Sequence, residues 1–153
     1  MPPRPSAPPL PRWRVIGATL HRLADPVAPG SPPAPGVVLL EAPDAAALRR
    51  VPRHLRADVE GAEAVALSLA GGRVAAVCAA GAVTETLWDV GIDTVAEHRR
   101  RGHATAAFRA LAAHMAATGH QPVWGAEDEN VASLRLAAKL GFEPAGHLAV
   151  VKR

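Results

Sequence analysis

A glycine pair between two apolar runs constrains the fold of this chain more than any other feature of its sequence. Residues 64–70 (AVALSLA) and 73–80 (RVAAVCAA) are strand-like, and Gly71-Gly72 joins them. Two-residue glycine loops favour hairpins because their residues adopt positive φ readily. The sequence therefore predicts an antiparallel hairpin. Residues 86–95 (TLWDVGIDTV) predict a third strand, with Gly91 as a bulge or a point of close approach.

The elements around this meander alternate between helical and strand-like patterns. Residues 37–42 predict a buried strand, and two short helices are expected within 44–60. The later elements are expected to be a helix at 103–119, a strand at 121–126, a helix at 131–140 and a strand at 147–152. This order predicts an α/β (α+β layered) domain with a mixed β-sheet flanked by helices.

Proline is concentrated at the start of the chain. Eleven of the 15 prolines lie within residues 1–36, and proline disrupts regular hydrogen-bonded structure. We therefore expect a flexible N-terminal segment over 1–36 and the folded domain over 37–153. Residues 13–23 (WRVIGATLHRL) interrupt the proline-rich pattern, either as a short strand at the sheet edge or as a linker with a few apolar residues.

Charge and cysteine content narrow the class of protein. The 17 Lys and Arg exceed the 14 Asp and Glu because of residues 1–36, so the remaining chain is balanced, which argues against a dedicated nucleic-acid-binding protein. Cys78 is the only cysteine, which rules out an intrachain disulfide and indicates neither an oxidising compartment nor a thiolate metal site. Apolar runs are too short to cross a bilayer, so we expect a cytoplasmic protein.

The turn after residue 95 carries the strongest chemical signal. It leads from the third strand into a helix and contains Arg99, Arg100 and Arg101, followed by Gly102 and Ala104. Main-chain N–H groups at a helix start favour a bound phosphate, and arginines attract a polyanion. Gly102 would let a ligand approach the main chain. The alternative is an arginine-rich solvated turn.

A second segment offers a polar face on the later helix. Asn130, Ser133 and Ala137 are three and four residues apart, so they share one helical face. An amide and a hydroxyl beside a small residue suit a slender polar ligand. The alternative is an N-cap at Asp128 or Asn130, followed by an ordinary amphipathic helix.

Together, residues 99–104 (RRRGHA) and 130–142 (NVASLRLAAKLGF) resemble the two diagnostic motifs of the GNAT superfamily of acetyltransferases. The similarity extends over about residues 64–147. It implies a sheet splayed between the strand ending at Val95 and the strand 122–126, with acyl-CoA in the gap. The residues that the resemblance assigns to acyl-CoA are Thr94, Val95, Arg99, Arg100, Arg101, Gly102, His103, Ala104, Thr105, Asn130, Ser133 and Ala137.

The resemblance implies an N-acetyltransferase that moves an acetyl group from acetyl-CoA directly to the primary amine of a small molecule or peptide. A thioester is already activated, so no metal is required, and the histidines show no ligand spacing. The general base is expected at Asp89, or second at Asp93; the alternative is that both simply face solvent. Backbone N–H groups of the strand 91–95 are the expected oxyanion donors.

Two departures from the family pattern leave alternatives open. The chain has no tyrosine, which the family often uses near the position of Ala137 to protonate the leaving thiolate. A non-catalytic acyl-CoA-binding or regulatory module is therefore the alternative function. Only 11 residues follow Phe142, where the family usually has two strands, so either the hairpin is abbreviated or a homodimer partner completes the sheet.

Acceptor specificity has no recognisable pattern. The arginines between Arg49 and Arg56 would attract an acidic acceptor or form a solvated helix face, and charge-pattern arguments favour the solvated face.

Overall fold

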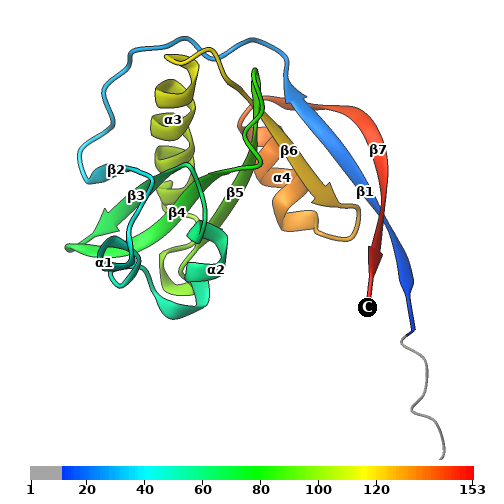
Figure 1. Cartoon of the computed structure of the whole chain (residues 1–153), viewed down its shortest axis with the longest axis horizontal. Helices are drawn as coiled ribbons and strands as arrows, with labels where there is room; N and C mark the ends of the chain where they lie inside the picture. The colour runs from blue at the N-terminus through cyan, green and yellow to red at the C-terminus, as the bar shows by residue number, and fades with distance from the viewer. Residues whose placement is uncertain (1–11) are drawn as a thin grey trace, which may run out of the picture.

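The computed structural model describes residues 12–153, which form one seven-stranded sheet with helices on both faces (Figure 1). The strands are β1 (Arg14–Leu23), β2 (Val37–Glu41), β3 (Ala64–Ala70), β4 (Arg73–Gly81), β5 (Leu87–Thr94), β6 (Gln121–Glu127) and β7 (Phe142–Lys152). Their order in the sheet is β2-β3-β4-β5-β6-β1-β7, and only the β5–β6 pair is parallel among the described strands. The predicted mixed sheet is confirmed.

Two long and two short helices flank the sheet. The helices are α1 (Ala45–Leu48), α2 (Arg56–Val59), α3 (His103–Ala116) and α4 (Val131–Lys139), with 3-10 turns η1 (Arg53–Leu55) and η2 (Ala96–His98). The Asp44 side chain caps α1, accepting a 2.8 Å hydrogen bond from the Ala47 amide. None of the helices within residues 12–153 combines the length and hydrophobicity that crossing a membrane requires.

The predicted hairpin is confirmed in detail. β3 and β4 pair antiparallel up to Ala70 and Arg73, and the two residues between them adopt positive φ, 57° at Gly71 and 78° at Gly72. A side chain at either position would strain the turn, which explains why two glycines stand there.

Alternation along β3 divides the core into two clusters. Ala64 and Ala66 pack with α3, whereas Val65 and Leu67 pack with the α1–α2 segment on the opposite face. Aromatic side chains fill the α3 side: Trp88, Phe108, Trp124 and Phe142 stack or meet edge to face at centroid distances of 5.3 to 6.4 Å. Each face of the sheet therefore packs against its own set of helices.

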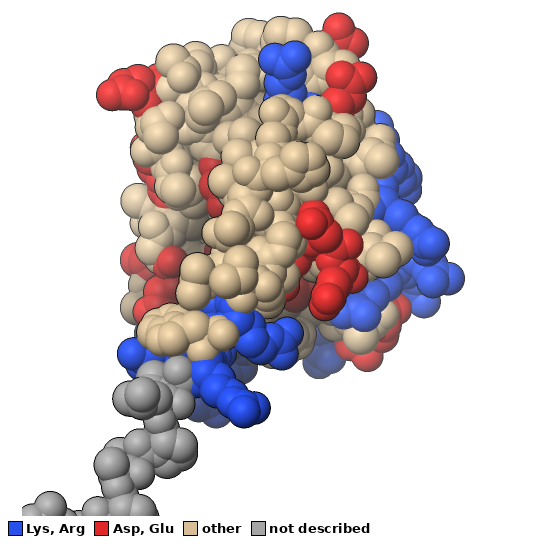
Figure 2. Space-filling view, turned by 90° about the vertical axis from the view of Figure 1, so that its right-hand side faces the viewer, with Lys and Arg blue, Asp and Glu red and all other residues tan. Residues whose placement is uncertain are grey.

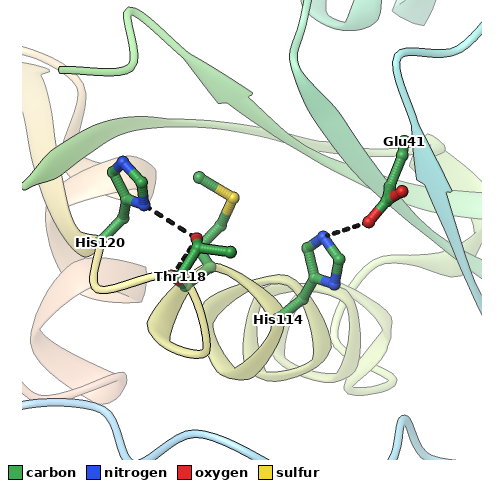
Figure 3. Close-up of polar contacts among 5 residues, drawn as sticks. Glu41, His114, Thr118 and His120 are labelled. Atoms are coloured by element: carbon green, nitrogen blue, oxygen red, sulfur yellow. Dashed lines mark hydrogen bonds and ion pairs between the residues drawn. The ribbon is translucent and has the colours of Figure 1, made fainter. Parts of the chain in front are cut away.

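Polar contacts fix α3 against the sheet. The His114 imidazole on α3 lies 3.3 Å from the Glu41 carboxylate at the end of β2 (Figure 3). Past the helix end, the Thr118 hydroxyl donates to the Met115 carbonyl at 2.9 Å and lies 2.9 Å from His120 Nδ1 (Figure 3). These contacts lie at the C-terminal end of α3, whose body packs mainly against β3 and β4.

Residues 14–23 form an interior strand. β1 pairs antiparallel with β6 on one side and with β7 on the other, and Ala18 faces Glu127 and Leu148 in these two neighbours. The strand interpretation of residues 13–23 is confirmed, but the edge position is wrong. The domain boundary expected at residue 36 also needs correction for residues 14–23, because they complete the sheet. Residues 1–11, which were expected to be flexible, lie outside the described residues.

The C-terminal departure from the family pattern is also explained. β7 is a single 11-residue strand, and the strand that separates it from β6 comes from the other end of the same chain. The sheet is therefore completed without a partner subunit, and its edges are β2 and β7. A homodimer stays a prediction that the fold does not require.

Basic side chains gather where β1 begins and β7 ends (Figure 2). In that region Arg14 lies opposite Lys152 in the β1–β7 ladder, and the Arg153 guanidinium lies 4.9 Å from the ring centroid of Trp13. Lys152 also forms an ion pair with Glu127. The rest of this face carries both signs of charge, in keeping with a balanced domain (Figure 2).

Candidate functional site

A gap opens in the sheet where β5 and β6 separate. The two strands pair in parallel from Leu87 and Gln121 to Asp89 and Val123, and within the described residues their pairing ends there. Figure 1 shows the strands diverging beyond this point. β5 still pairs with β4 on its other side up to Thr94. The splay implied by the family resemblance is present at the expected strands.

Strand alternation decides which main-chain groups face this gap. The Val95 amide donates to the Ala75 carbonyl at 2.8 Å, so Val95 bonds toward β4. In an antiparallel ladder, bonding directions alternate along the strand, so the main-chain groups of Ile92 and Thr94 point toward the gap. The Thr94 amide also donates to the Asp93 carboxylate at 2.7 Å. The Val95 main chain, expected to face the cofactor, bonds toward β4 instead, whereas the Ile92 main chain faces the gap.

The turn into α3 has the geometry of an anion site. Arg100 and Gly102 adopt positive φ of 62° and 82°, and Gly102 is the N-cap of α3. The first bond of the helix runs from the Ala106 amide to the Gly102 carbonyl at 3.0 Å. The amides of His103, Ala104 and Thr105 thus precede the helical bonding pattern, and within residues 12–153 they have no acceptor.

Charge reinforces this helix start. Arg99, Arg100 and Arg101 are all exposed, and none of them forms an ion pair within the described part of the chain. Free amides, the positive end of the helix dipole and three guanidinium groups all favour a polyphosphate at this point.

The His103 ring belongs to the fold. Its Nδ1 lies 2.8 Å from the hydroxyl of Ser68, a buried residue of β3. The ring also meets His98 edge-on at 5.7 Å. The His103 ring is therefore engaged within the fold, and its main-chain amide remains without an acceptor in the described structure.

On the other side of the gap, the polar residues of α4 form hydrogen bonds within the protein. The Asn130 side chain accepts from the Ser133 amide at 3.1 Å, so the N-cap interpretation is correct for Asn130. The Ser133 hydroxyl accepts a 3.0 Å hydrogen bond from the buried indole of Trp124. Ala137 is completely buried and presents no surface to a ligand, contrary to its predicted place beside the cofactor.

Acidic side chains lie on the face of β5 that is directed away from α3 and toward α2. Pairing with β4 is uninterrupted from Asp89 to Thr94, so there is no bulge at Gly91, and Asp89 and Asp93 share one face of the strand. At Gly91 the strand contacts α2 at an ordinary packing distance, since the Asp58 carbonyl oxygen lies 3.8 Å from the position that a Cβ would take there.

The packing of α2 on β5 adds Asp58, an acid that no pattern in the sequence singles out. Burial and then the charge of Asp93 raise the pKa of Asp58. Burial also raises the pKa of Asp89, and a main-chain hydrogen bond from Val90 partly offsets this effect. Asp58 lies far from β5 in sequence, so only the packing of α2 reveals their association.

Comparisons with known proteins agree with this geometry. The family model for GNAT acetyltransferase matches residues 66–150. This span is more than half of the chain and includes both the turn before α3 and the whole of α4. The chain belongs to the GNAT acetyltransferase family. No functionally curated protein matches the sequence.

Solved structures show the same fold. A GNAT-family protein from Novosphingobium aromaticivorans is 27% identical, with a TM-score of 0.73 over 97% of this chain and 70% of that one. A GCN5-related N-acetyltransferase-like protein from Streptococcus suis is 17% identical, with a TM-score of 0.69 over 92% and 62%. A GNAT-family acetyltransferase from Colwellia psychrerythraea is 17% identical, with a TM-score of 0.64 over 92% and 56%. The chain thus spans 56% to 70% of the length of these proteins.

Metal binding has no obvious place in the described structure. Among residues 12–153, no three His, Cys, Asp or Glu side chains are grouped so that they could hold a metal ion. Cys78 is buried, and burial raises the pKa of its thiol far above the ordinary range. It therefore packs as an apolar side chain.

Proposed function

We propose that this protein is an N-acetyltransferase that moves an acetyl group from acetyl-CoA directly to a primary amine. The observation that carries the proposal is the set of free amides at His103, Ala104 and Thr105, beside the gap between β5 and β6. Membership of the GNAT acetyltransferase family supports an acyltransferase, and the free amides supply the anion site that a CoA pyrophosphate needs.

The cofactor would lie between the anion site and the fork of the two strands. Its pyrophosphate would bind the start of α3, with Arg99, Arg100 and Arg101 nearby. Its pantetheine arm would pair with the main chain of Ile92 and Thr94, as an additional strand would. Asn130 and the hydroxyl proton of Ser133 would meet the arm from the α4 side, since that hydroxyl can still donate while it accepts from Trp124.

The chemistry then requires alignment, a proton acceptor and an oxyanion donor. Asp89 stands at the fork where β5 and β6 separate, and burial raises the pKa of its carboxyl. A carboxylate of raised pKa accepts a proton from an ammonium group more readily, so Asp89 is the first candidate for the general base. Asp93 is the second. The main-chain N–H groups of β5 that face the gap are the proposed oxyanion donors.

A non-catalytic acyl-CoA-binding module is the second candidate. One observation favours it: Ala137 occupies the position where the resemblance expects an acid and is fully buried, so no side chain is assigned to protonate the leaving thiolate. A thiolate is a stable leaving group, and water can protonate it. Turnover with any amine therefore separates the two candidates.

Calorimetric titration with acetyl-CoA and with CoA tests the proposal. Gly102→Glu should abolish binding, because it adds a negative charge and strain at the anion site. Gly119→Glu is a matched control, since Gly119 also has positive φ of 83° and open space around it but lies beyond the other end of α3. Failure of the natural protein to bind either compound, or equal effects of the two substitutions, would contradict the assignment.

A further inference from the structure

A groove lies on the sheet face opposite α3, beneath the segment that contains α1, η1 and α2. Its volume is about 510 Å³. Apolar side chains of β2, β3 and β4 form one wall: Val38, Leu40, Leu67, Leu69 and Val74. A wall of this kind suits the apolar body of a small molecule.

Arginines surround this apolar wall. Arg49, Arg50 and Arg56 come from the helical segment, and Arg73 comes from the start of β4. The ion pairs within residues 12–153 are His114–Glu41 and Lys152–Glu127, so none of these four arginines has a carboxylate partner there. Glu97 is the one acidic side chain lining the groove, whose charge is therefore strongly positive.

One of the basic groups, Arg56, is held in position by hydrogen bonds. The Arg56 guanidinium donates to the main-chain carbonyls of Val51 at 3.0 Å and Arg49 at 3.2 Å, which ties the helical segment together. His98 also lines the groove, and its buried Nδ1 has no hydrogen-bond partner in the described structure. A buried ring nitrogen without a partner is costly, and a bound ligand would remove that cost.

The groove lies beside the acidic face of β5. Val95 lines the groove, and Asp93 precedes it by two residues on the same side of the strand. Asp93 in turn lies near Asp58 of α2. A single molecule could therefore place an ammonium group near the carboxylates and an anionic group among the arginines.

We propose that this groove binds an organic anion with an apolar body, and that the anion is one end of the amine acceptor. The second part rests on the proposed acetyltransferase function. The acceptor would then be an acidic primary amine, with its amine toward β5 and its carboxylate or other anion toward Arg50 and Arg73. The arginines that the sequence assigned to a solvated helix face become determinants of specificity.

Fluorescence titration with 1-anilinonaphthalene-8-sulfonate, an aromatic anion, tests the groove without requiring turnover. The natural protein should bind this probe, and the double variant Arg50→Gln/Arg73→Gln should bind it roughly tenfold more weakly or worse, because charge-assisted hydrogen bonds are lost. Arg109→Gln/Arg135→Gln removes the same charge from α3 and α4 and should leave the affinity unchanged. Absence of binding, or equal affinities in all three proteins, would overturn the proposal.

Calorimetry with two amines tests the link to the acceptor. In the presence of saturating CoA, 4-(aminomethyl)benzoate should bind roughly tenfold more tightly than benzylamine, and Arg50→Gln/Arg73→Gln should remove this preference. If 4-(aminomethyl)benzoate and benzylamine bind with equal affinity to a protein that binds the sulfonate through its arginines, the acceptor role is overturned. Failure of CoA itself to bind would instead contradict the proposed function, so the two failures are distinguishable.

Discussion

Asp58 and Asp93 come from α2 and β5, yet the charge of Asp93 helps to raise the pKa of Asp58. Burial is the larger cause of the shift. The two acids come together because α2 packs against β5, where the Asp58 carbonyl oxygen lies beside Gly91. An acidic pair at this place would attract an ammonium group and disfavour a second negative charge.

Asp58→Asn should stabilise the protein at neutral pH. A carboxyl whose pKa is raised on folding contributes stability below its unfolded pKa, and this contribution is lost as pH rises through the folded pKa. The amide removes that loss, so the variant should unfold at a higher temperature at pH 7. At about pH 3 the two proteins should unfold alike, since an ordinary Asp is then protonated. Glu60→Gln, an exposed control beyond α2, tests whether removing any charge has this effect. A lower unfolding temperature for Asp58→Asn at pH 7 would contradict the argument.

Asp89→Asn should lower turnover about 100-fold or more, because general bases typically contribute 10² to 10⁴. The raised pKa of Asp89 predicts that kcat/KM falls on the acid side at a higher pH than an ordinary carboxyl would give. This acid limb should disappear in the variant. Steady-state rates across pH, with CoA affinity measured in parallel, test the prediction. An acid limb that persists in Asp89→Asn and disappears in Asp93→Asn would transfer the role to Asp93.

Ser133→Ala should destabilise the fold by about 1 to 3 kcal/mol, since the buried indole N–H of Trp124 loses its acceptor. Urea unfolding of the single variants, Trp124→Phe and the double variant gives the coupling between the residues. In the Trp124→Phe background, removal of the hydroxyl should cost much less. Additive effects would show that this hydrogen bond contributes nothing to stability.

Hydrogen exchange should identify β1 as part of the stable domain. Amides in an interior strand are bonded in the sheet, so those of residues 16–20 should exchange far more slowly than those of residues 28–34, which form no helix or strand. Mass spectrometry after peptic digestion resolves both segments. Equally fast exchange would mean that β1 is not docked in solution.

Features set by local geometry could be predicted from the sequence. The glycine-closed hairpin and the turn before α3 depend on neighbouring residues, and both were correctly placed. β1 was harder, because its two partner strands lie near the opposite end of the chain and proline-rich flanks obscured its pattern. Asp58 and the arginine-lined groove also required the packing of α2 on the sheet, which no spacing in the sequence reveals.

Several residues have roles that are ambiguous in the sequence, and their contacts in the structure assign those roles. Gly91 fits a bulge or a close approach equally well as a sequence feature, and the unbroken pairing with β4 excludes the bulge. Ala137 shares a helical face with Asn130 and Ser133, but packing against the core buries it. Helical periodicity gives the direction of a side chain and not the neighbour that covers it.

The interior position of β1 also constrains how the protein can be made. Among the described strands, β1 leaves the ribosome before the other six, whereas its partners β6 and β7 follow all the others. β2 to β5 can assemble as a meander during translation, but β1 cannot pair until β6 has been synthesised. Pairing of β1 therefore follows the synthesis of the meander, and it closes the sheet.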